Sequence, residues 1–278
     1  MWLLEPFQDD FMRRALLGII LASTNCAVLG AYVVLRRMAF VSTALTHTIL
    51  PGIVFAILQG FSLYWGALGA AILTALGIGG ITNRREMRED TAIGVILSFM
   101  FALGVLMMTQ SQSFRDFSGL LFGSVLGVTT QDLWLIASVT GIVFTVLFLF
   151  HKELELSSYD EEYAQQIGAR PRQMRFLILI LVALSTVSCV RLVGALLTTA
   201  LLVTPAAAAI MLARTLRGVM VLASLIGIAS GVGGLYLSYY VARVPVGAAV
   251  VLVCSGFFFV SFILKQATNL FRKKLSAV

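Results

Sequence analysis

Charged side chains are scarce in this chain. Asp, Glu, Lys and Arg make up 12% of its 278 residues, whereas about 25% is typical of soluble domains. Hydrophobic residues account for 59% of the sequence, and the mean hydropathy is +0.97. This composition excludes a soluble domain with a single anchor and predicts a membrane protein throughout.

Several functional motifs are also missing. There is no GxxxxGK(S/T) motif, so any energy from ATP would have to come from another chain. GxSxG is absent, and the apolar runs contain no obvious Asp, Glu or Lys, which disfavours an intramembrane protease and a proton-driven secondary transporter. The net charge of +7 comes from short clusters without a basic face or an aromatic platform, so we expect no nucleic-acid partner. We therefore expect a subunit that is not an enzyme and has no bound cofactor.

Cysteine is equally rare. Cys26, Cys189 and Cys254 lie inside apolar runs, their number is odd, and no CxxC occurs. This pattern is typical of small buried hydrophobic side chains and indicates nothing about the redox compartment.

What the sequence has in abundance is long apolar runs. A membrane-spanning helix needs roughly 20 mostly apolar residues, and about nine runs qualify, which predicts an all-α polytopic protein. Eight spans would result if the seventh run is broken or re-entrant. The runs are Ala15–Leu35, Ala39–Leu58, Leu63–Ile81, Ala92–Thr109, Leu133–Phe150, Phe176–Leu192, Ala195–Ala213, Val219–Val241 and Val246–Leu264.

Basic residues cluster at every second boundary between these runs. Such clusters mark the cytoplasmic side of a membrane protein, so we expect an external N-terminus and a cytoplasmic C-terminus. Three further segments stand out. Gln110–Gln131 contains FSGLLFGSVLG, which is too short to span and is expected to be interfacial or re-entrant. Segment 152–175 is expected to be cytoplasmic, and the basic tail 265–278 is expected to lie on the inner leaflet.

One polar cluster lies within an apolar run, in STALTHTILPG (Ser42–Gly52). Thr43 and His47 are four residues apart and share a helix face. Pro51 cannot donate the helical hydrogen bond to the carbonyl of His47, so a kink is expected there; Pro205 predicts a second kink in a later span. The cluster fits either a histidine that is hydrogen-bonded to a neighbouring helix or an ion-binding group.

Six blocks of the sequence together resemble the permeases of the manganese/zinc/iron class of bacterial ABC importers. They are LLEPFQDDFMRRALLG, GAYVVLRRMAFVSTALTHTILPG, REDTAIGVILS, YDEEYAQQIGARP, VRLVGALLTTALLVTPAAAA and LSYYVARVPVGAAVV, in order over almost the full length. The resemblance implies that residues 1–278 form a single permease domain in a bacterial cytoplasmic membrane, with the fold of metal-chelate and cobalamin (type II) importers. It also implies ATP-binding subunits, a metal-binding substrate-binding protein and a second permease as partners.

The resemblance also assigns site residues. In this family an acid and a histidine four residues apart line the central pathway and bind or gate the metal. The histidine matches His47, but the acid position matches Thr43, which carries no charge. Either a different permease supplies the carboxylate in a heterodimer, or the metal is handled mainly by His47 and backbone oxygens.

The block YDEEYAQQIGARP resembles the family's coupling helix, which docks on the ATPase. Asp160 or Ser158 is expected to cap a short helix with Glu161 in its first turn, and Gly168 and Pro171 are expected to end it. Tyr163, Ala164 and Ile167 are expected to form one small apolar face. The sequence pattern alone also fits an ordinary amphipathic loop helix.

Other functions stay open at this point. An ABC permease for a metal chelate or a cobalamin-like ligand has a similar mechanism, although such permeases are usually longer. A secondary transporter or channel would work without an ATPase, and a scaffold would not transport at all. The sequence does not determine which of Mn, Zn or Fe would be the substrate.

Overall fold

The structure, a computed structural model, describes residues 9–82, 88–110, 127–241 and 244–275. This part of the chain is helical and contains no β-strand. The segment expected to be interfacial or re-entrant, Gln110–Gln131, lies largely outside the described residues. The helices are α1 (Asp10–Leu35), α2 (Ala39–Thr48), α3 (Leu50–Gln59), α4 (Leu63–Thr82), α5 (Glu89–Gln110), α7 (Thr130–Leu149), α8 (His151–Tyr159), α9 (Glu161–Gln166), α10 (Pro171–Val193), α11 (Ala195–Leu212), α12 (Leu216–Tyr240) and α13 (Val246–Leu275).

The predicted number of spans is confirmed. Among the described residues, nine segments are long and apolar enough to cross a membrane, with α2 and α3 forming one of them. The seventh is a continuous helix over Ala195–Leu212, so the structure supports nine spans rather than eight. Helices α1 and α10 are the most deeply buried spans, followed by α2–α3, whereas fewer than a third of the residues of α5, α7 and α13 are buried within the chain. Helix α1 packs against α7, α10, α11 and α12 at the centre of the bundle.

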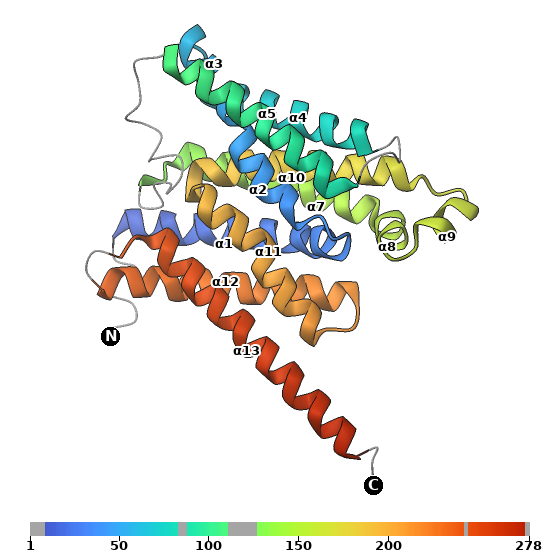
Figure 1. The fold of residues 1–278 in the computed structure, drawn as a ribbon. Coiled ribbons are helices and arrows are strands. Elements are labelled where there is room, and N and C mark those ends of the chain that lie inside the picture. Colours follow the sequence, from blue (N-terminus) through green and yellow to red (C-terminus); the bar gives the residue numbers. More distant parts are fainter. Residues whose placement is uncertain (1–8, 83–87, 111–126, 242–243, 276–278) are drawn as a thin grey trace.

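The basic boundary residues gather at one end of the bundle. Figure 1 shows α8 and α9 at that end, together with the α1–α2 and α11–α12 turns. Side-chain contacts confirm the grouping: Arg36 donates to Ser157 and Ser158, and Arg217 donates to His151. The boundaries that carry basic residues in the sequence thus lie together at one end of the folded chain.

The two prolines behave differently. Between α2 and α3 the helix is interrupted at Ile49, and Pro51 occupies the first turn of α3, where its missing N–H costs nothing. The interruption therefore lies two residues before Pro51, in the region where the sequence predicts a kink. Pro51 cannot donate to the His47 carbonyl, but the backbone N–H of Ile49 is directed at this oxygen instead. Helix α11, by contrast, continues across the buried Pro205 without interruption.

Glycines allow two close helix crossings. A Cβ atom on Gly30 of α1 would overlap the backbone carbonyl of Leu202 in α11. Where α3 crosses α4, a Cβ on either Gly52 or Gly66 would overlap the other residue's carbonyl oxygen. Small residues commonly permit such backbone approach between membrane helices. Gly52, the last residue of the STALTHTILPG block, is thus required by packing.

Helix α13 extends well past its apolar part. It runs without interruption from Val246 to Leu275, so the basic tail begins as a continuation of the last span. Figure 1 shows this C-terminal part projecting away from the other helices. Its position relative to a lipid surface remains a prediction.

Candidate functional site

One face of α2 is left uncovered by the rest of the chain. Phe40 and Thr43 are exposed and His47 is half-buried, whereas most of the remaining α2 side chains are buried. The three residues follow a spacing of three and four, so they lie along one helix face. A polar pair in a membrane span is thus directed away from the core of this chain.

A shallow groove of about 310 Å³ runs along this face beside Thr43. Residues of α2, α11 and α13 line it: Ala39, Phe40, Ser42, Thr43, Leu196, Thr199, Ala200, Val203 and Val251. On the α5 side, the Phe101 ring meets the His47 imidazole edge-on, with centroids 6.0 Å apart and an interplanar angle of 85°. Thr43 and His47 therefore lie between α5 on one side and α11 with α13 on the other.

The imidazole of His47 has no hydrogen-bond partner among the residues that the structure describes. Its contact with Phe101 is apolar and leaves both ring nitrogens unsatisfied. The hydroxyl of Thr43 is also unsatisfied within that part of the chain, although its backbone carbonyl accepts from Thr46. Polar groups in a membrane span need a partner, a cavity or an ion. A histidine hydrogen-bonded across a proline kink to a neighbouring helix, the structural alternative in the sequence analysis, is not what the structure shows.

Within the same described residues, no group of three or more His, Cys, Asp and Glu side chains is placed to bind a metal ion. His47 and Thr43 thus form a two-residue set with one nitrogen and one neutral oxygen. Imidazole nitrogen suits zinc, iron, copper and nickel, whereas manganese favours oxygen ligands.

The predicted coupling segment is helical where it was expected to be. The Asp160 carboxylate caps α9 by accepting a hydrogen bond from the Tyr163 N–H at 2.9 Å. Gly168 has a φ of +83°, and the Ala169 N–H closes the helix by donating to the Ala164 carbonyl at 3.0 Å. This left-handed ending is a common helix terminator that favours glycine. Of the two expected caps, Asp160 is the one used, and Pro171 starts α10 as well as following α9.

The apolar side chains of α9 do not share one face. Ala164 is fully buried, whereas Tyr163 and Ile167 are 51% and 55% exposed. Helix α9 packs against α8 and α10, and this packing turns Ala164 inward. The prediction of a single face formed by all three residues is therefore wrong: Ala164 anchors the helix, and Tyr163 and Ile167 face outward.

An arginine network connects this segment to the spans. Arg175 of α10 lies 3.8 Å from both Glu161 of α9 and Glu89 of α5. Arg36, at the end of α1, donates to Ser157 and Ser158 of α8. Burial, followed by repulsion from Arg175, lowers the pKa of Arg36 to about 10, and the nearby glutamates oppose this shift. Arg36 stays charged at neutral pH and ties the segment to the bundle.

Sequence reasoning missed the role of these arginines. Their position at span boundaries was interpreted only as a topology signal, and their partners lie far away in sequence: Ser157 is 121 residues from Arg36. The acids in the first turns of α5 and α9 were the only local indication in the sequence that a basic partner was needed.

Comparison with known proteins identifies the family. A model of the ABC 3 transport family matches residues 8–265. The chain belongs to the ABC 3 transport family. Relatives of the chain include the "Manganese transport system membrane protein MntC" of Listeria monocytogenes, which is 35% identical over 98% of this chain and 97% of the relative's length. The "Probable iron transport system membrane protein" of Haemophilus influenzae is 36% identical over 94% of this chain and 96% of its own.

Solved structures agree with this ABC 3 assignment. PsaBC from Streptococcus pneumoniae, determined in complex with a Fab, contains a chain with a TM-score of 0.83 and 30% identity, covering 94% of both chains. An inward-facing metal-chelate type ABC transporter has a TM-score of 0.69 at 17% identity, over 91% of this chain and 85% of that one, which shows likeness of fold alone. The predicted ABC importer permease fold is confirmed. The chain is a multi-pass membrane subunit of an ABC transporter, distinct from the ATPase.

Proposed function

We propose that this protein is the transmembrane subunit of an ATP-driven importer of a divalent transition metal, with manganese, iron and zinc as the candidate substrates. The observation that carries this proposal is the unsatisfied His47 imidazole on an exposed face of a membrane span. The names of the two relatives, one for manganese and one for iron, support a metal substrate without selecting one.

The pore is formed together with a second permease that covers the α2 face. Thr43 and His47 would be costly to leave against lipid, since both side chains are polar and have no hydrogen-bond partner in the described part of the chain. A second chain would bring its own ligands to the same place. If that chain is a copy, the site has two imidazoles and two threonine hydroxyls; a paralogous permease would add a carboxylate at the position that Thr43 occupies here.

An incomplete ligand set suits transport. A transported ion must be bound well enough to enter and weakly enough to leave. One imidazole and one neutral hydroxyl per chain, supplemented by water or backbone oxygen, meet this requirement better than a closed structural site with four protein ligands. His47 would accept the ion from the external binding protein and lose it when the inner half of the path opens.

The end of the bundle that carries α8 and α9 faces the cytoplasm in this proposal, because the basic clusters gather there. The α9 segment contacts a partner ATPase, which hydrolyses ATP, and a metal-binding protein docks at the opposite end. Movement at α9 reaches the spans through Arg175, which pairs with both Glu161 and Glu89.

The measurement that tests the function is the total cellular Mn, Fe and Zn of cells with and without this gene, grown in metal-depleted medium. A selective fall in one metal in the cells without the gene supports the proposal and identifies the substrate. Unchanged content of all three metals, in a strain with no paralogous permease, contradicts it.

The coupling surface can be tested with Ile167→Asp. This side chain is 55% exposed, so the substitution leaves the fold intact but places a charge where an apolar contact with the ATPase is expected. We expect ATP-driven metal uptake to fall at least about fivefold, since burying even an uncharged polar group without a partner costs on the order of 1–3 kcal/mol and burying a charge costs more. The measurements are uptake and co-purification of the ATPase.

Gln165→Asp is the matched control, because it adds the same charge to the exposed polar side of α9. It should retain uptake and assembly. Normal uptake and normal co-purification in Ile167→Asp would show that α9 is not the coupling surface.

A further inference from the structure

A second groove lies on a different face of the bundle, away from the proposed ion path. It has a volume of about 520 Å³, and α1, α7 and α12 form it together with the first residue of α8. Val28 of α1 and Leu147 of α7 are buried at its floor. The exposed Phe148 of α7 and the exposed Val221 and Leu225 of α12 form its walls.

The groove interior offers no polar group to a soluble ligand. Its two hydroxyls are both bonded within their own helices: Thr24 donates to the Ile20 carbonyl at 2.7 Å, and Ser224 donates to the Met220 carbonyl at 2.8 Å. The remaining interior lining is aliphatic, aromatic or thioether. Such a surface matches a hydrocarbon chain.

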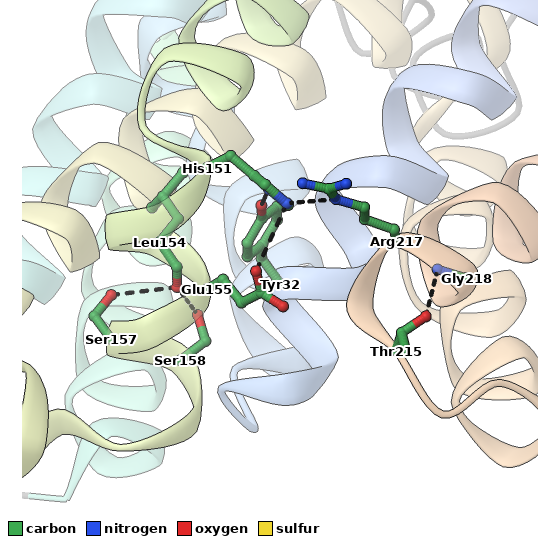
Figure 2. Close-up of polar contacts among 9 residues, drawn as sticks. All are labelled: Tyr32, His151, Leu154, Glu155, Ser157, Ser158, Thr215, Arg217 and Gly218. Atoms are coloured by element: carbon green, nitrogen blue, oxygen red, sulfur yellow. Dashed lines mark hydrogen bonds and ion pairs between the residues drawn. The ribbon is translucent and has the colours of Figure 1, made fainter.

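The groove ends at a polar cluster drawn in Figure 2. Arg217 of α12 reaches across to His151 and donates from Nε to the imidazole Nε2 at 3.4 Å, and His151 Nδ1 lies 3.0 Å from the Tyr32 hydroxyl. Because a guanidinium can only donate, the neutral imidazole accepts at Nε2 and carries its proton on Nδ1, which donates to the Tyr32 oxygen. Tyr32 is fully buried, so this chain of contacts fixes the position of Arg217.

The charge of Arg217 is only partly compensated by the protein. Glu155 lies 3.7 Å from His151 Nε2 but does not line the groove. Arg217 forms no ion pair with any carboxylate in the part of the chain that the structure describes. Its terminal guanidinium nitrogens, the pair that recognises phosphate in a bidentate manner, remain open for an anion at the mouth of an apolar groove.

The dimensions agree with one lipid leaflet. From Arg217 to Leu225 the groove follows α12 over eight residue-to-residue steps, or about 12 Å. This is close to half of the roughly 30 Å hydrocarbon thickness of a bilayer. Basic residues at the ends of grooves between membrane helices are suited to anionic headgroups.

We propose that this groove is a binding site for one anionic phospholipid of the leaflet at the α8–α9 end. Its phosphate pairs with Arg217, and one acyl chain lies between Phe148 and Leu225. The lipid connects α7 to α12 across α1, and it thereby stabilises the start of α8, the helix against which the proposed coupling segment packs. This site does not depend on which ion the protein transports.

The test uses the full chain, purified in detergent with the subunits that accompany it. Phosphatidylglycerol and phosphatidylcholine are added in equal amounts, and native mass spectrometry counts the retained molecules of each. We expect the wild type to prefer phosphatidylglycerol. Arg217→Gln is expected to lower this preference about fivefold, the effect of one basic residue near a membrane surface. Arg214→Gln, an exposed arginine of the same turn that does not line the groove, should leave it unchanged.

A second pair of variants tests the groove itself. Leu225→Trp fills it and should reduce retention of both lipids, whereas Ile142→Trp, at a similarly exposed position of α7 outside the groove, should not. An unchanged preference in Arg217→Gln overturns the proposal. Unchanged lipid retention in Leu225→Trp also overturns the proposal. If Leu225→Trp instead loses an accompanying subunit, the groove binds a protein partner and not a lipid.

Discussion

Replacing His47 with alanine is expected to reduce metal uptake at least about tenfold, since weakening even the groups that orient a metal ligand typically costs 10- to 100-fold. The imidazole has no hydrogen bond to lose in the described part of the chain, and it is only half-buried. The protein should therefore fold and assemble normally. Uptake of radioactive or isotopically enriched metal, measured together with co-purification of the ATPase, separates the two effects.

The control for this substitution removes a neighbouring polar group that faces the other way. Thr48→Val deletes a buried hydroxyl one residue later, which in the described part of the chain forms a single 3.4 Å hydrogen bond, to the Leu45 carbonyl of its own helix. It should retain uptake. If His47→Ala transports as well as Thr48→Val, His47 is not part of the ion path.

Gly30→Ala should destabilise the protein by about 2–3 kcal/mol, the upper range for inserting a methyl group into a tightly packed core. The new Cβ would overlap the Leu202 carbonyl, which belongs to the backbone of α11 and cannot move without shifting that helix. Thermal unfolding in detergent, followed by loss of the monodisperse peak in size-exclusion chromatography, measures the effect.

Gly69→Ala provides the comparison for this prediction. Gly69 lies within α4, and a Cβ atom there meets nothing within 4 Å. Alanine has the higher helix propensity, so this variant should be as stable as the wild type or slightly more so. Equal stability of the two variants would mean that α1 and α11 do not cross as closely as described.

The spans were readable from the sequence because each depends on local composition. Nine apolar runs correspond to nine candidate spans among the described residues, and Pro51 marks the interruption that divides the second span into α2 and α3. The caps of α9 were also local, since Asp160 and Gly168 act within a few residues of themselves. The inward orientation of the Ala164 side chain could not be predicted locally, because it depends on how α9 packs against α8 and α10.

The sequence analysis also did not predict helix α8, because its position depends on contacts with residues that are distant in sequence. Its sequence, HKELELSSY, is largely polar, and it is positioned by the buried Leu154 and by the hydrogen bonds that Ser157 and Ser158 accept from Arg36. The cysteines give a further example. All three are buried as expected, but the 3.6 Å contact between the Cys26 and Cys189 sulfurs joins residues 163 positions apart. The neighbours of His47 likewise come from helices distant in sequence.

The interruption at Ile49 divides the second span into halves with different neighbours. One half, α3, is fixed to α4 by the Gly52–Gly66 crossing, whereas the other half, α2, packs against α10 and α11; helix α5 contacts both halves. Helix α10 starts at Pro171, directly after the proposed coupling segment. In the proposed transport cycle, a displacement that begins at the ATPase would pass through α10 to the half that carries His47, while α3 stays fixed to α4. One span would then provide both the stationary outer barrier and the moving ligand.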